Sequence, residues 1–163
     1  MVSKRQVREE GHRRKFLAVA DNTPECGRAV KYAARRCAAI DADLVIVYVV
    51  EPAEFQHWIG VEEVMRAEKH EEANTILHRF EEKVMADAGI RPQLIPREGP
   101  MVSEITALIE EDPDIALLIL AAGDGTEGPG PLVSSVAGTG AAFPIPVTIV
   151  PASLTDEDME HLV

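Results

Sequence analysis

The segment from residue 42 to residue 52, ADLVIVYVVEP, restricts the fold more than any other part of this chain. It is rich in β-branched residues, almost wholly apolar, and closed by Glu51 and Pro52, as is typical of a short strand. A strand that is apolar at successive positions buries both of its faces, and such strands occur in parallel sheets covered by helices on both sides. The segment therefore predicts an α/β fold.

Further strand-like segments alternate with stretches of helical periodicity. Strands are predicted at residues 15–21, 42–52, 91–99, 115–122 and 145–151; helices are predicted around 29–37, at 61–88, around 105–109 and within 132–141. Asn22 or Thr23 is expected to cap the first helix, and Gly89 to end the longest one. This order predicts a single-domain, Rossmann-like open parallel sheet of five strands with helices on both faces.

The domain is expected to span residues 15–151. Residues 1–14 carry mixed, mostly basic charges and predict a flexible tail, whereas residues 152–163 form an acidic tail in which Thr155 could cap a helical turn.

The net charge of −12 argues against nucleic acid or a membrane surface as a partner, because both are bound through positive fields. No run approaches the roughly 20 apolar residues of a membrane span, and no secretory signal is recognisable. Cys26 and Cys37 fall in one predicted helix about 16 Å apart, too far to pair. These observations favour a cytoplasmic protein with free thiols.

The carboxyl ends of the predicted strands are where a ligand is expected, because open parallel sheets bind ligands at the point where the strand order reverses. Three segments could lie there: AVADNT, YVVEP and the glycine-rich stretch from Ala121 to Gly140. That stretch, AAGDGTEGPGPLVSSVAGTG, contains six glycines and four serine or threonine residues, so its backbone and hydroxyl groups could approach an anion.

Several ordered segments resemble the universal stress protein family. The likeness runs from about Lys15 to Pro151 and rests on KFLAVADNTPECGRAVKYA, ADLVIVYVVEP, REGPMVSEITALIEEDPDIALLILA and FPIPVTIVP. The resemblance implies an adenine nucleotide α-hydrolase-like fold, a cytoplasmic location and a homodimer formed through the last strand. Some members of the family bind ATP, with Mg where the nucleotide requires it, and others bind no nucleotide.

On the adenine side, the resemblance assigns Asp21 to the region that meets adenine and ribose, next to Val19 and Ala20. It assigns Val49 to the apolar position that contacts adenine. The alternative for Asp21, from the sequence alone, is a cap on the following helix.

On the phosphate side, the sequence departs from the ATP-binding pattern of the family, in which a glycine pair precedes Gly-Ser or Gly-Thr at a helix start. Counting from the strand and counting back from PIPV disagree by two residues, and Pro129 and Pro131 each remove an amide donor. The residues that could still serve an anion are Gly123, Gly125, Gly128, Gly130, Ser134 and Ser135. The loop is therefore interpreted as a remodelled anion loop.

Other candidate sites carry less weight. His57 and Trp58 could form a lid, although a structural role at the core edge or a subunit contact is favoured. His70 and His78 lack a third ligand at compatible spacing, so no metal site is predicted. GDGTEG follows the fourth strand and is followed by Pro129, a setting that argues against a dinucleotide site. No catalytic residue is predicted, because no base is evident beside the Ser134–Ser135 pair.

Two functions remain open. The first is a stress-response protein that holds ATP or another adenine nucleotide, with slow hydrolysis at most. The second is a dimeric interaction module of the same fold that binds no nucleotide, whose protein partner is unknown. The valine-rich last strand predicts antiparallel pairing between two subunits in either case.

Overall fold

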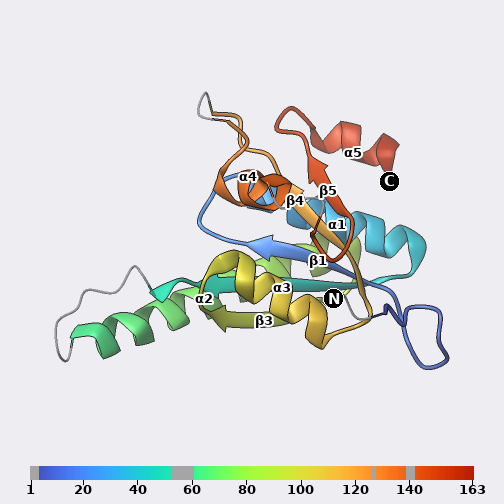
Figure 1. Ribbon diagram of the computed structural model, residues 1–163. Helices are drawn as coiled ribbons and strands as arrows, with labels where there is room; N and C mark the ends of the chain where they lie inside the picture. Colours follow the sequence, from blue (N-terminus) through green and yellow to red (C-terminus); the bar gives the residue numbers. More distant parts are fainter. Residues whose placement is uncertain (1–3, 53–60, 126–127, 139–141) are drawn as a thin grey trace.

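The computed structural model describes residues 4–52, 61–125, 128–138 and 142–163. Its five strands are β1 (Lys15–Ala20), β2 (Asp43–Val50), β3 (Gln93–Glu98), β4 (Ile115–Ala121) and β5 (Val147–Val150). They form one parallel sheet in the order β3-β2-β1-β4-β5 (Figure 1). The predicted fold class is confirmed.

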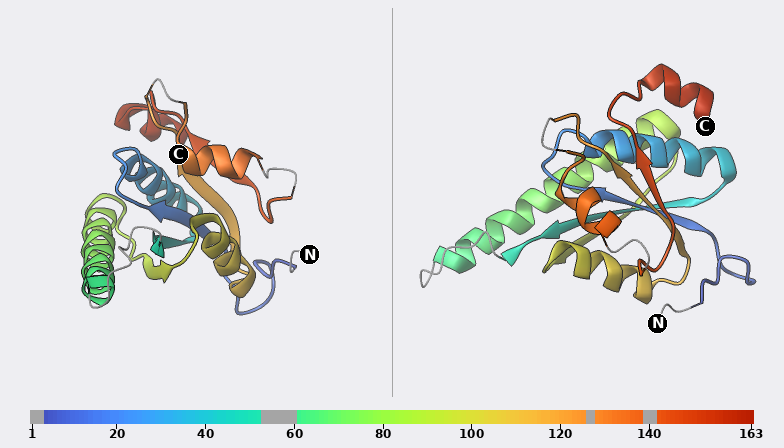
Figure 2. Two further views of the ribbon diagram at one scale, coloured as in Figure 1. Left: turned by 60° about the vertical axis from the view of Figure 1, so that its left-hand side comes forward. Right: turned by 45° about the horizontal axis from the view of Figure 1, so that its top comes forward.

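Five helices connect or follow these strands. They are α1 (Cys26–Ile40), α2 (Val61–Ala88), α3 (Met101–Glu111), α4 (Pro131–Gly138) and α5 (Asp156–Leu162). The views in Figures 1 and 2 show α1 and α2 on one face of the sheet and α3 and α4 on the other. None of the helices in the described ranges combines the length and the apolar character that crossing a bilayer demands.

The two faces of the sheet bury alternate residues of the same strands. Leu44, Ile46 and Tyr48 of β2 belong to the core beneath α1 and α2, whereas Val45 and Val47 belong to the core beneath α3 and α4. This period of two follows from the pleat of a strand. Each fully buried aliphatic side chain contributes about 1.5–3 kcal/mol by leaving water. The continuous apolar run of β2 is thus explained by two cores sharing one sheet.

Helix α1 packs over the central strand through small side chains. Ala18 and Ala20 of β1 and Ala29 and Ala33 of α1 lie in the same buried cluster, and all are at most 1% exposed. Alanines on both elements let the helix approach the sheet closely, so this contact leaves little room for a larger side chain. The close approach fixes the start of α1 beside the end of β1.

Helix ends differ in part from expectation. Helix α1 begins at Cys26 after Glu25, and neither Asn22 nor Thr23 caps it, because the Thr23 N–H and hydroxyl both donate to Asp21 Oδ1. Gly89 ends α2 as predicted, with φ 70° and its N–H donating to the Met85 carbonyl. Thr155 caps α5 in a reciprocal pairing with Asp158.

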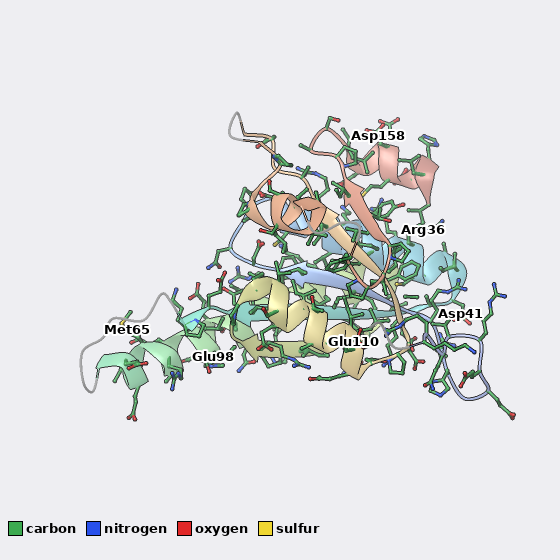
Figure 3. All side chains as sticks on the ribbon, in the orientation of Figure 1. Arg36, Asp41, Met65, Glu98, Glu110 and Asp158 are labelled. Carbon is green, nitrogen blue, oxygen red and sulfur yellow. The ribbon has the colours of Figure 1, made fainter. Side chains whose placement is uncertain are left out.

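Helix α2 is about 42 Å long at 1.5 Å per residue, which exceeds the length of the strands it accompanies. Its first turns project beyond the sheet, and Met65 lies on this projection in Figure 3. The Arg66 Nε lies 2.8 Å from Glu98 Oε1 at the end of β3. The buried residues of α2 in the described part of the chain are Ala73, Leu77 and Val84, all far from its projecting start.

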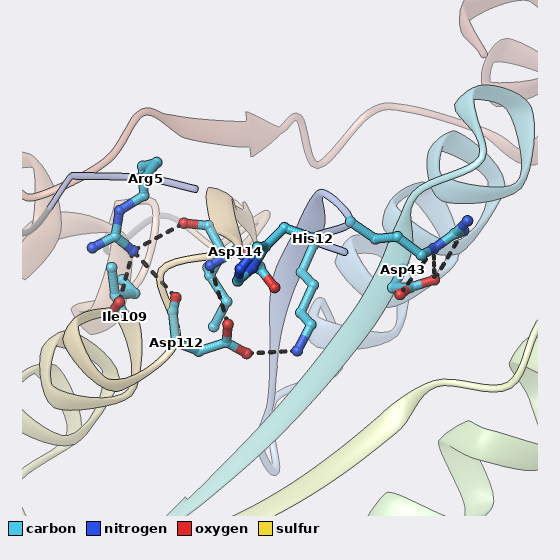
Figure 4. Close-up of polar contacts among 9 residues, drawn as sticks. Arg5, His12, Asp43, Ile109, Asp112 and Asp114 are labelled. Carbon is cyan, nitrogen blue, oxygen red and sulfur yellow. Dashed lines mark hydrogen bonds and ion pairs between the residues drawn. The ribbon is translucent and has the colours of Figure 1, made fainter. Parts of the chain in front are cut away.

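Residues 4–14 lie against the amino-terminal edge of the sheet, where the sequence predicted a flexible tail. The Arg5 guanidinium donates to the carbonyls of Ile109, Asp112 and Ile115 at 2.7, 3.3 and 3.2 Å (Figure 4). His12 Nδ1 lies 2.7 Å from Asp114 Oδ1. Ile109 lies in the last turn of α3, which ends at Glu111, so Arg5 donates to a carbonyl that the end of a helix leaves without a helical partner. The basic residues are therefore partly used in tertiary contacts.

Candidate functional site

The strand order reverses between β1 and β4, and both strands end at the same edge of the sheet. The segments that follow β1, β2 and β4 are the three that the sequence predicted to meet there. Asp21 follows β1 directly, Glu51 follows β2, and the glycine-rich loop follows β4. This edge of the sheet is the candidate site.

Asp21 is held in place by its own turn. Its Oδ1 accepts a hydrogen bond from the Thr23 N–H at 2.8 Å and another from the Thr23 hydroxyl, while its main-chain carbonyl lies 3.4 Å from the Cys26 Sγ. An aspartate that bonds the backbone two residues on forms an Asx turn, which orients its carboxylate before the helix begins. The interpretation of Asp21 as a helix cap is therefore wrong.

A small cavity of about 120 Å³ lies between the ends of β1 and β2. Its lining includes Asp21, Val49, Glu51, Lys69 of α2 and Met101 of α3. Val49 is 5% exposed, and the lining combines apolar residues with two acidic residues, Asp21 and Glu51, and the basic Lys69. Such a mixture suits a flat heteroaromatic group with polar edges. Lys69 and Met101 were not found from the sequence, because they come from helices whose approach to this edge only the fold decides.

The glycine loop is closed on itself. The Gly123 N–H donates to the Pro129 carbonyl at 3.0 Å, so this amide is already used within the loop. Gly128 and Gly130 have φ of 99° and 106°, a backbone conformation that favours glycine. Gly130 immediately precedes α4, which starts at Pro131. Gly128 and Gly130 thus allow a tight turn directly before the start of α4.

The carboxylate of Glu25 lies against this loop from the α1 side. Its Oε1 is 3.1 Å from the point where a Cβ on Gly123 would stand and 3.6 Å from the corresponding point on Gly130. Glu25, Asp21 and residues 129–133 line a second cavity, of about 40 Å³. A Cβ at Gly123 would press on the Glu25 carboxylate, whereas a Cβ at Gly130 would meet it at an ordinary van der Waals distance. This placement was missed in the sequence analysis, because Glu25 directly precedes α1 and no local pattern distinguishes it from any other acidic residue at a helix start.

The remaining residues assigned from the sequence lie at different depths. Val19 and Ala20 are buried within β1, so they can offer only backbone groups to a ligand. Gly125 is exposed within the loop. Ser134 and Ser135 are exposed and lie beyond the first turn of α4, because the helix starts at Pro131. The linings of the two cavities beside Asp21 include residues of the first turn of α4 but neither serine.

The two cysteines, Cys26 and Cys37, are free and buried. Burial raises the pKa of Cys26 to about 11 and that of Cys37 to about 12, so both stay protonated at neutral pH.

Among the described residues, no three His, Cys, Asp or Glu side chains are grouped to hold a metal ion. His57 and Trp58 lie outside the described part of the chain.

A nucleotide fits one half of the site better than the other. Beside Asp21 and Val49 there is a partly apolar cavity with polar edges, as a base needs. At the loop, a carboxylate stands where phosphate would approach the glycines. Both cavities are smaller than the roughly 300 Å³ at which pockets for drug-sized ligands begin. Binding a whole nucleotide therefore requires side chains at this edge to move.

Comparison with known proteins identifies relatives of this arrangement. The sequence profile of the universal stress protein family matches residues 12–151. No curated protein sequence gives a significant match. Universal stress protein UspA from Lactobacillus plantarum superimposes with a TM-score of 0.71 at 17% identity, over 84% of this chain and 97% of that one.

Two further solved structures carry nucleotides according to their descriptions. A universal stress protein in complex with cAMP matches with a TM-score of 0.63 at 19% identity, over 86% of this chain and 98% of that one. A universal stress protein family protein from Arabidopsis thaliana with AMP bound matches with a TM-score of 0.57 at 13% identity, over 90% and 98%. At these identities the structures show the shared fold. The profile match covers most of the sequence, and this chain belongs to the universal stress protein family.

Proposed function

We propose that this protein binds an adenine nucleotide at the carboxyl ends of β1, β2 and β4 and acts as a cytoplasmic stress-response protein. The observation that carries the proposal is the meeting of Asp21, Val49 and the glycine loop at the reversal of strand order. The carboxylate of Asp21 can accept hydrogen bonds from ribose hydroxyls or an adenine amino group, and Val49 offers an apolar surface to the base. The relatives solved with cAMP and AMP support an adenine ligand.

The residues proposed to contact the ligand follow from their places. Asp21 and Val49 would hold the nucleoside, with backbone groups of Val19 and Ala20 behind them. Backbone amides of the loop at Gly125, Gly128 and Gly130 and the first turn of α4 would face a phosphate. Gly123 would not contact the phosphate through its amide, because that amide is bonded to the Pro129 carbonyl. Its role would be to close the loop. Mg would accompany the nucleotide only if more than one phosphate is bound.

A second function has its own supporting observation. The carboxylate of Glu25 beside Gly123, together with the small cavities, favours a module of the same fold that binds no nucleotide. Such a module would act through protein contacts.

The deciding experiment has two steps. The protein is purified without added nucleotide and denatured, and any released small molecule is identified by mass spectrometry. Adenosine, AMP and ATP are then titrated by calorimetry. Stoichiometric release of an adenine compound, or saturable binding of one, supports the proposed site; no release and no heat from any of the three favours the interaction module.

Asp21→Asn localises the binding. Asparagine keeps the oxygen that accepts from Thr23, so the turn should persist while the charge is lost. We expect affinity for the adenine ligand to fall roughly tenfold, since hydrogen bonds to charged groups are worth about 1.5–3 kcal/mol. Glu82→Gln, an equal charge change on the exposed surface of α2, should leave affinity unchanged. Equal affinities in the two variants would place the ligand elsewhere.

We also propose that two copies pair through β5. Among the described residues this strand is at the edge of the sheet and pairs with β4 alone, and Ile149 on it is 44% exposed. An open strand edge with an exposed isoleucine is suited to pairing with a second copy. Light scattering after gel filtration should give twice the chain mass for the wild type and a smaller mass for Ile149→Lys. A wild type that is strictly monomeric at high concentration would contradict the pairing.

A further inference from the structure

We infer that Glu25 sets the phosphate content of the ligand, selecting adenine compounds with at most one phosphate over ATP. The inference rests on the proposed adenine site and adds a specificity-determining residue to it. Its basis is the position of one carboxylate at the place where a glycine loop would receive phosphates.

The loop and Glu25 fit each other closely. Oε1 of Glu25 lies within 3.6 Å of the Cβ positions of both Gly123 and Gly130, which come from opposite ends of the loop. The space left beside it is a cavity of about 40 Å³, little more than the volume of a single water molecule. The Glu25 carboxylate therefore occupies the side of the loop from which a phosphate would approach Gly123 and Gly130.

The backbone at this point favours an anion, and Glu25 already supplies one. Helix α4 starts at Pro131, next to Gly130, so the Glu25 carboxylate faces the positive end of the α4 dipole. Three positions of the loop offer a phosphate no free amide. Pro129 and Pro131 have none, and the Gly123 N–H is bonded to the Pro129 carbonyl. A phosphate would therefore have to displace the carboxylate or lie beside it at a repulsive distance.

The charged groups from other segments nearest this loop, besides Glu25, are Asp21 and Arg28, and of these two only Asp21 lines the cavity. Asp21 lines the same cavity and adds a second carboxylate. Arg28 follows Glu25 by three residues, but its Nη1 donates to the Ala122 carbonyl at 3.5 Å, and in the described part of the chain it forms no ion pair with Glu25. Lys69 lies on the far side of Asp21, in the cavity that contains Val49.

This distribution of charge separates short ligands from long ones. A nucleoside has no phosphate, and a monophosphate can stay near the ribose, in the cavity that Lys69 and Glu51 line and where Lys69 also pairs with Glu72 at 3.5 Å. A second and third phosphate must extend toward the loop and meet Glu25. The site should therefore rank adenosine and AMP above ATP, which is the reverse of the order given by a loop whose amides are free for phosphates.

The test uses calorimetric titration of adenosine, AMP and ATP into the full chain, with magnesium and again with a chelator. The variants are Glu25→Gln, which keeps the shape and removes the charge, and Glu82→Gln as the matched control. Glu25→Asp, which keeps the charge and withdraws it by one methylene, is a second probe. Circular dichroism and urea midpoints check that every variant folds.

We expect the wild type to bind AMP at least tenfold more tightly than ATP in both buffers. Glu25→Gln should raise ATP affinity at least tenfold and change AMP affinity less than threefold, Glu25→Asp should give a smaller gain for ATP, and Glu82→Gln should give none. The inference is overturned if the wild type binds ATP as tightly as AMP, or if Glu25→Gln and Glu82→Gln behave alike.

Failure of the proposed site gives a different result. If neither the wild type nor Glu25→Gln binds any of the three compounds, the adenine site itself is refuted, and the specificity inference with it. If Glu25→Gln binds ATP and the wild type does not, the site exists and Glu25 is its selector.

Discussion

The two edges of the sheet are built from opposite uses of charge. At the amino-terminal edge, Arg5 donates to three carbonyls, Lys15 pairs with Asp112 at 2.8 Å, and His12 Nδ1 lies 2.7 Å from Asp114 Oδ1. At the carboxyl-terminal edge, Asp21 and Glu25 bring two carboxylates to one small cavity beside a glycine loop. The amino-terminal edge is stabilised by contacts between segments far apart in the sequence. The carboxyl-terminal edge brings two negative charges close together.

The contrast indicates that the amino-terminal edge of this sheet contributes to the stability of the fold, whereas the carboxyl-terminal edge is suited to binding a ligand. The amino-terminal edge receives helix C-termini, whose open carbonyls attract Arg and Lys. The carboxyl-terminal edge receives helix N-termini, whose open amides attract anions. In this chain the second edge uses its own glutamate as the anion. The three predictions below test this division, from the largest expected effect to the smallest.

Arg5→Ala should destabilise the fold by about 1–3 kcal/mol, because carbonyls at the end of α3 lose a charged donor. Urea denaturation followed by circular dichroism measures the change. Arg91→Ala removes an equal charge from an exposed position and should change stability by less than about 0.5 kcal/mol. Equal losses in the two variants would mean that the amino-terminal edge is not clamped by Arg5.

Gly130→Ala should cost about 1–2 kcal/mol, because φ of 106° is unfavourable for a residue with a Cβ. The control is Gly138→Ala at the end of α4, where a Cβ meets nothing within 4 Å and stability should be unchanged or slightly raised. Both are compared by thermal and urea unfolding. If Gly130→Ala is as stable as Gly138→Ala, the loop does not depend on the positive φ of Gly130.

Asp87→Asn should lower stability by about 1 kcal/mol at pH 6 and by progressively less below pH 4. The Arg35 guanidinium donates to Asp87 and lowers the pKa of that carboxyl, so the ionised pair stabilises the folded state above the unfolded pKa of about 3.9. That contribution is lost as the pH falls through the lower, folded pKa.

The measurement for this pair is the urea midpoint at several pH values between 6 and 2.5. Wild type and Asp87→Asn should converge as the solution becomes acidic, while Glu82→Gln should track the wild type throughout. A gap that stays constant with pH would show that Asp87 acts through packing rather than through its charge.

Much of the fold could be predicted from local pattern. The apolar run ending at Val50 indicated a strand buried on both faces, and Gly89 marked the end of α2, because both effects depend on a few neighbouring residues. The start of α1 was predicted too early. Asp21 takes the Thr23 N–H and hydroxyl into its own turn, a local competition between an Asx turn and a cap that spacing alone does not settle.

The candidate site was predicted less completely than the fold. Asp21 and Val49 could be named because the resemblance to the universal stress protein family assigned both, at the carboxyl ends of two recognisable strands. Lys69, Met101 and Glu25 could not, because their places depend on how helices cross the sheet edge. Ser134 and Ser135 were expected at a helix start, but α4 begins at Pro131, which moves both serines past its first turn.

The sequence by itself determined the order of elements and the residues of the two cores, since strand and helix periodicities are set by backbone geometry and apolar burial. Only the tertiary structure decided how charges far apart in the chain meet. Residues 1–14 suggest a mobile arm until Arg5 reaches the end of α3, 104 positions away from it at Ile109. Glu25 likewise becomes a neighbour of Gly123 and Gly130 only because β1 and β4 lie side by side, and such contacts leave no periodic trace in the sequence.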